Sequence, residues 1–184
     1  LWIAGYFKGT IDLGGGPLQS AYEMNDLFVA KLDPQGNHLF SARFGDEGGG
    51  DGTQLPGQLV TLPQGGVVLV GVFDGTLSFG GDVFSTVPSS ANGFIARFDD
   101  KGNHVWSRTL SDTPTLGYAA GAAVLPDGSV AVTGTYFAEM DCGGELLPDQ
   151  GFGDIVVLKL DAEGKQVFCR SLGGPNEESG ARIV

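Results

Sequence analysis

Short apolar runs separated by glycine-rich polar turns make up most of the chain. In the last third, the apolar runs span residues 122–125, 130–136, 155–160 and 166–172. The first two are joined by a Pro-Asp-Gly turn and the last two by a turn at 161–164, residue types that suit tight hairpins. No stretch shows Ala, Glu, Lys and Leu at helical spacing. The pattern predicts a four-stranded antiparallel meander and almost no helix.

This unit occurs three times. The most similar segments are DLFVAKLD (26–33), NGFIARFD (92–99) and DIVVLKLD (154–161). The turn glycines behind them are Gly36, Gly102 and Gly164, spaced by 66 and 62 residues. The glycines that end an earlier apolar run are Gly5, Gly71 and Gly134, spaced by 66 and 63. Two independent landmarks in one register indicate a structural repeat.

Both faces of each predicted meander are rich in Val, Phe, Ile and Leu. A unit of about 60 residues can bury two such faces only by stacking on copies of itself. Radial stacking gives the blades of a β-propeller. A β-sandwich usually has one polar face per strand, and a parallel β-helix repeats at about 20 residues. We therefore predict an all-β fold, a β-propeller built of four-stranded antiparallel blades.

The blade repeats span approximately 1–56, 57–120 and 121–179 of a single propeller region, 1–184. The chain starts at a second strand, and residues 180–184 match the start of a first strand, so this segment belongs to the next blade or closes a seam. Propellers typically have four to eight blades. We therefore expect these three to belong to a larger ring or to a dimer of three plus three blades.

The charge and the apolar runs of the chain limit the classes of partner that it can bind. Ten Lys and Arg against 22 Asp and Glu give a formal net charge of −12, which repels a phosphate backbone. We expect no nucleic acid partner. No apolar run approaches the roughly 20 residues of a membrane helix, so we expect no membrane insertion.

The motifs DLFVAKLD (26–33), GNHLFS (36–41), GTIDLGGG (9–16) and VAVTG (130–134) resemble the SBBP-type β-propeller repeats of bacterial secreted and surface proteins. The resemblance covers nearly the whole chain. It implies an extracellular or cell-surface protein, often large, with binding or adhesive roles. The motifs are specific for the repeat but say almost nothing about activity, because the family is defined by residues that form blades and not by a site.

The two histidines, His38 and His104, occupy equivalent positions in successive repeats, where the third repeat has Gln166. A residue that recurs once per repeat is expected to serve the blade, so we predict no catalytic residues. Trp106 aligns with Phe40 and Phe168, and we expect these rings to pack between neighbouring blades; sugar stacking would require an exposed ring. Asp33, Asp99 and Asp161 open hairpin turns, where their carboxylates can accept backbone N–H bonds.

The segment 45–52 is acidic and glycine-rich. We expect it to be a solvated loop. The alternative is a calcium site formed by Asp46, Glu47 and Asp51, because calcium prefers several oxygen ligands. The spacing does not match the EF-hand series, and no other cofactor is indicated.

Cys142 and Cys169 both lie in the third repeat. They are predicted either to form a disulfide that joins the exit of the second strand to the fourth strand, or to be two separate buried thiols. Two cysteines neither require nor exclude an oxidising compartment.

These features predict a non-catalytic extracellular scaffold that binds a protein or carbohydrate ligand. The loops that vary between repeats are where recognition is expected. One alternative is a structural subunit that self-associates through strand or blade pairing. Another is a fragment of a propeller hydrolase whose active-site loops lie elsewhere.

Overall fold

The computed structural model describes residues 1–21, 24–46, 52–113, 116–144 and 146–184. In these ranges the regular structure consists of β-strands, and every pairing between them is antiparallel. The all-β class predicted from the sequence is confirmed. The described residues form no helix, and therefore none that is long and apolar enough to span a membrane.

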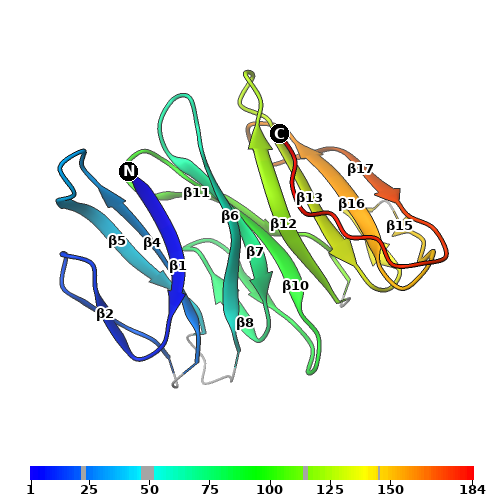
Figure 1. The fold of residues 1–184 in the computed structure, drawn as a ribbon, viewed down its shortest axis with the longest axis horizontal. Coiled ribbons are helices and arrows are strands. Elements are labelled where there is room, and N and C mark those ends of the chain that lie inside the picture. Colours follow the sequence, from blue (N-terminus) through cyan, green and yellow to red (C-terminus); the bar gives the residue numbers. More distant parts are fainter. Residues whose placement is uncertain (22–23, 47–51, 114–115, 145) are drawn as a thin grey trace.

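Three larger sheets follow one another along the chain and stand side by side (Figure 1). Sheet 1 contains β1 (Trp2–Phe7), β4 (Asp26–Leu32) and β5 (His38–Phe44). Sheet 2 contains β6 (Gln54–Thr61), β7 (Val67–Phe73), β10 (Asn92–Phe98) and β11 (His104–Thr109). Sheet 3 contains β12 (Gly117–Val124), β13 (Val130–Tyr136), β16 (Asp154–Leu160) and β17 (Gln166–Leu172).

In sheets 2 and 3 the four strands lie in chain order, as a meander requires. The predicted bounds of β13 and β17 agree with the structure. The first strand is longer than predicted, because β12 begins at Gly117 and contains a β-bulge between Ala119 and Gly121. The small residues of this segment gave no apolar signal in the sequence. Sheet 1 begins with the counterpart of a second strand, as expected.

A small hairpin is inserted between the second and third strands of each unit, where the sequence predicted only a glycine-rich connection. The hairpins are β2 (Thr10–Asp12) with β3 (Pro17–Gln19), β8 (Thr76–Ser78) with β9 (Val83–Ser85), and β14 (Met140–Asp141) with β15 (Leu146–Leu147). Their turns contain Gly14, Gly80 and Gly143 at positive φ. Strands of two or three residues are too short for a period-two pattern to be visible.

Sheet 2 buries both faces of its central strands. Nearly every residue of β7 and β10 is buried. One apolar cluster joins Leu27 and Val29 of sheet 1 to Leu69 and Phe94 of sheet 2. A second joins sheet 2 to sheet 3, for example through the side chains of Val70, Ile95, Val132 and Leu158. Burial of each such side chain contributes about 1.5–3 kcal/mol, so each sheet depends on its neighbour.

The contact between sheets is the same at both junctions. The ring of Phe40 in β5 lies against Gly102, in the turn that joins β10 to β11. The ring of Trp106 in β11 lies against Gly164, in the corresponding turn of sheet 3, and its Nε1 donates to the Ala162 carbonyl at 3.0 Å. The prediction that these aromatic residues pack between successive units is confirmed for Phe40 and Trp106.

A cation from each sheet reaches the same turn of the next sheet. Lys31 Nζ donates to the carbonyl of Asp100 at 2.6 Å, and Arg97 Nη1 donates to the carbonyl of Ala162 at 2.6 Å. Lys31 and Arg97 occupy equivalent positions on β4 and β10. Because ring and cation both contact one turn, each sheet is placed on the next with the same offset.

The first strand of a unit packs across the preceding sheet. β6 lies against β1 and β4, and β12 lies against β6, β7 and β10. At the second junction, the backbone of Ala119 and Ala120 passes close to Gly57. The C-terminal residues repeat this contact, because Ala181 and Arg182 pass equally close to Gly121. Residues 180–184 are not assigned as a strand, but they occupy the place that a first strand has in the other units.

Candidate functional site

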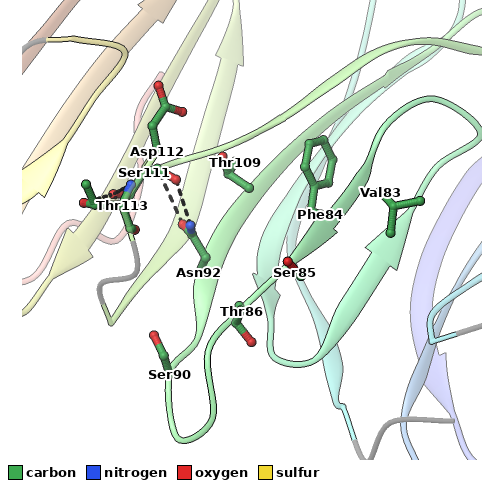
Figure 2. A pocket seen from close by; sticks show the side chains of 10 residues that line it. All are labelled: Val83, Phe84, Ser85, Thr86, Ser90, Asn92, Thr109, Ser111, Asp112 and Thr113. Atoms are coloured by element: carbon green, nitrogen blue, oxygen red, sulfur yellow. Dashed lines mark hydrogen bonds between the residues drawn. The ribbon is translucent and has the colours of Figure 1, made fainter. Parts of the chain in front are cut away.

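A polar pocket lies at the end of sheet 2 where β10 begins, beside the connection to sheet 3 (Figure 2). Its volume is about 290 Å³. The β9 strand and the segment after it form one side, and the end of β11 and the residues behind it form the other. The lining residues are Val83, Phe84, Ser85, Thr86, Ser90, Asn92, Thr109, Ser111, Asp112 and Thr113.

Asn92 holds the two sides of the pocket together. It is the first residue of β10 and is buried. Its Nδ2 donates to the carbonyl of Ser111 at 2.8 Å, and the N–H of Ser111 donates to its Oδ1 at 3.2 Å (Figure 2). The Ser111 hydroxyl in turn contacts the Thr113 carbonyl at 3.1 Å. This network ties residues 111–113 to the start of β10 and leaves no amide atom of Asn92 unpaired.

Other polar groups of the pocket form no hydrogen bond among the described residues, although the Asp112 carboxylate interacts electrostatically with Arg108. The hydroxyls of Ser85 and Thr109 and the carboxylate of Asp112 form no hydrogen bond there, and Ser85 and Asp112 are exposed. The half-buried ring of Phe84 packs against Phe73, with ring centroids 6.4 Å apart, and provides the apolar part of the wall. The site therefore offers hydroxyl, carboxylate and aromatic groups to a small polar molecule.

The corresponding places in sheets 1 and 3 are occupied by the protein's own side chains. In sheet 1, Asp26 takes the position of Asn92, and Arg43 takes that of Thr109; the guanidinium pairs with Asp26 Oδ2 at 2.5 Å. In sheet 3 the hydroxyl of Ser171 accepts from Tyr136 at 2.7 Å. Sheet 2 has only the short Thr109 side chain at this position, which explains why the pocket is there.

A second pocket of about 600 Å³ adjoins the first, and the two share Thr86 and Ser90. It is lined by the segment that follows β9 and by Gly52, Asp74 and Gly75. The N–H of Gly75 donates to Thr86 Oγ1 at 2.9 Å, which anchors this segment to the start of the β8–β9 hairpin. Together the pockets form a groove along residues 83–91. The sequence showed no motif here, because Ser and Thr in a turn carry no specific signal.

Of the three residues of the predicted calcium site, Asp46 lies within the described residues, and its side chain is buried and not solvated as predicted. It is 2% exposed, accepts a hydrogen bond from the Thr76 hydroxyl and another from the N–H of Gly52 at 3.2 Å, and so ties sheet 1 to the β8–β9 hairpin. Glu47 and Asp51 lie outside the described residues. In the described ranges, no three His, Cys, Asp or Glu side chains are grouped so that they could hold a metal ion.

The two histidines perform the same structural task in sheets 1 and 2. His38 Nε2 lies 3.0 Å from Ser41 Oγ, and His104 Nε2 lies 2.9 Å from Ser107 Oγ. Each imidazole also covers the turn of the inserted hairpin, so that a β-carbon at Gly15 or Gly81 would overlap it. Along the sequence, His38 and His104 are 66 residues apart, as are Gly15 and Gly81. The structure shows that they are one contact.

Burial lowers the pKa of His104, and the nearby carboxylate of Asp82 opposes this only in part. A folded-state pKa below the unfolded value means that unfolding takes up a proton at mildly acidic pH. Stability should therefore be complete above the unfolded pKa and fall as the pH drops through the folded pKa. Thermal melts between about pH 8 and about pH 5 test this. The control variant is His104→Gln, because the third repeat has glutamine at this position. Its loss of stability at acidic pH should be smaller than that of the wild type, and an equal loss would contradict the role of His104.

The aspartates that open the hairpin turns behave as predicted. Asp33 Oδ1 accepts from the N–H groups of Gln35 at 2.9 Å and Asn37 at 2.8 Å. Asp99 and Asp161 accept the equivalent pairs of bonds in sheets 2 and 3. The bonds from Asn37, led by its side-chain amide, lower the pKa of Asp33. These residues stabilise turns.

Of the two alternatives for the cysteines, the structure has the disulfide. Cys142 and Cys169 are joined with an S–S distance of 2.08 Å, and both are fully buried. The bond connects the end of the β14 strand to β17 within sheet 3.

Comparison with known proteins does not assign this site. No protein-family model matches the chain, and no curated protein sequence matches it either.

Proposed function

We propose that the three sheets are successive blades of a β-propeller, and that the protein is a non-catalytic scaffold that binds a ligand at the loops between blades. The observation that carries the blade arrangement is the repeated junction. Phe40 and Lys31 contact the next turn as Trp106 and Arg97 do. A junction repeated with one geometry generates a ring or a helix of units, and four-stranded units with buried faces suit a ring.

An extracellular or cell-surface location is part of the proposal. A buried disulfide suits an oxidising compartment. The net charge of −12 favours solubility and does not favour nucleic acid. The resemblance to SBBP-type repeats suggests the same location and an adhesive role.

Turnover and binding assays on the whole chain test the proposed function. The protein is screened for binding on arrays of glycans and extracellular proteins, and for hydrolysis of chromogenic glycosides, esters and peptides. We expect reproducible binding and no turnover. Hydrolysis by this chain that is lost in His104→Gln would overturn the non-catalytic proposal in favour of a hydrolase.

Self-association is a second candidate function. Sheet 3 carries Lys159 and Phe168 at the positions of Arg97 and Trp106, and sheet 1 carries Gly36 at the position of Gly102. These two faces have the chemistry of the observed junctions, and their combination is heterologous, so that it can build rings. Sedimentation velocity over a concentration series should show an oligomer. Phe168→Asp should weaken it, with exposed Val167→Asp as the matched control.

A further inference from the structure

The pocket of sheet 2 is an exception within the repeat. Asp26 and Arg43 fill the equivalent place in sheet 1 with an ion pair. In sheet 2 both are replaced by uncharged residues, Asn92 and Thr109, and Asn92 is fully used in holding the backbone of Ser111. The replacement removes the side chain that would fill the space and leaves a pocket, one side of which is held by the Asn92–Ser111 hydrogen bonds.

The chemistry of the lining selects a neutral polar ligand. Of the lining residues, only Val83 and Phe84 lack a hydroxyl, amide or carboxyl group. None of them is cationic, and the exposed carboxylate of Asp112 together with the charge of −12 opposes anions. These groups match a sugar ring. The hydroxyls can donate and accept hydrogen bonds, the carboxylate can accept them, and the aromatic ring can cover the apolar face of the sugar.

The size of the site sets the length of the ligand. A pocket of about 290 Å³ is at the lower end of the range for small-molecule sites, which is roughly 300–1,000 Å³. It therefore accommodates a single sugar residue. The adjoining pocket of about 600 Å³, reached past Thr86 and Ser90, provides room for the rest of a chain.

We propose that this groove binds a neutral oligosaccharide, with one sugar residue held between Phe84, Thr109 and Asp112 (Figure 2). The inference rests on the proposed binding function and names its ligand class. Asp112 accepts hydrogen bonds from the sugar hydroxyls, Ser85 and Thr109 donate or accept further bonds, and Phe84 contacts the apolar face of the ring.

Saturation-transfer NMR and calorimetry test the proposal with a panel of neutral methyl glycosides and disaccharides. The principal variant is Asn92→Asp with Thr109→Arg, which introduces the ion pair that sheet 1 already has and fills the pocket. We expect affinity for the bound sugar to fall at least about 10-fold, which corresponds to roughly 1.4 kcal/mol. Val105→Thr, at an exposed position of β11 away from the pocket, is the matched control and should bind as the wild type does.

Two single variants keep the test independent of the double variant's folding. Phe84→Ala and Asp112→Asn should each weaken binding several-fold, and circular dichroism monitors the fold. Absence of binding by every neutral sugar would overturn the inference, as would a sugar that binds the filled variant with unchanged affinity. Preference for uronic acids or for a polar peptide would overturn the ligand class. If the arrays show a partner whose binding survives filling of the pocket, the scaffold function stands and only this site is rejected.

Discussion

Alanine at Gly134 should destabilise the protein by on the order of 3 kcal/mol. A β-carbon there would lie 2.0 Å from the carbonyl oxygen of Tyr118 on the neighbouring strand β12. This carbonyl precedes the β-bulge between Ala119 and Gly121, and a bulge moves the backbone of its strand towards the partner. Because the obstructing atom belongs to the backbone, it cannot rotate away. Denaturant unfolding followed by circular dichroism measures the loss.

The repeat provides a matched control for this prediction. Gly71 has the same relation to β6, with the carbonyl oxygen of Leu55 2.2 Å from the added carbon, and Gly71→Ala should be equally harmful. At Gly5 the added carbon would meet the end of the Phe28 ring at 2.6 Å, which is a movable side chain. Gly5→Ala should therefore lower the free energy of unfolding clearly less than the other two substitutions. Equal losses at all three positions would show that the glycines serve backbone flexibility and not the bulge.

Removal of the disulfide should have an effect of similar size. The bond closes a loop of 27 residues, and the loss of chain entropy in the unfolded state corresponds to about 3–4 kcal/mol. Cys142→Ala with Cys169→Ala should therefore lower the midpoint of guanidinium unfolding. Hydrogen exchange should rise first in β17 and in the β14–β15 hairpin, which the bond connects.

Reduction provides the control for the second prediction. Wild-type protein in dithiothreitol should approach the stability of the double alanine variant, and the variant itself should not respond to the reductant. Alkylation without reductant, followed by mass measurement of unfolded protein, should label neither cysteine. Labelling of both would contradict the disulfide and favour two buried thiols.

The inserted hairpins link the repeat to the candidate site. The hairpins of sheets 1 and 2 are covered by the first residue of the last strand, His38 of β5 and His104 of β11. The pocket uses the β8–β9 hairpin as a wall. Variation in these hairpins and in the residues behind the fourth strand changes the surface without disturbing the stacked sheets. The proposed binding function would use this arrangement, since loops on a constant scaffold often carry recognition.

The all-β class, the period of the repeat and the position of most strands can be derived from the sequence alone. These follow from local chemistry, because apolar runs define strands and Asp and Gly at fixed offsets define turns. The Asp33 turn is an example, since its carboxylate bonds to residues two and four positions ahead. The burial of Asp46 could not be predicted from local sequence, because its hydrogen-bond partner Thr76 is 30 residues away along the chain.

The contacts of the glycines and aromatic rings and the location of the pocket follow from the three-dimensional packing of the sheets. Gly134 is required by a bulge on another strand, and Trp106 is held by a turn of another sheet. The pocket exists because Thr109 does not reach Asn92 as Arg43 reaches Asp26. Each of these depends on contacts between segments distant in the chain, and spacing along the sequence contains no information on the distance between side chains on different strands.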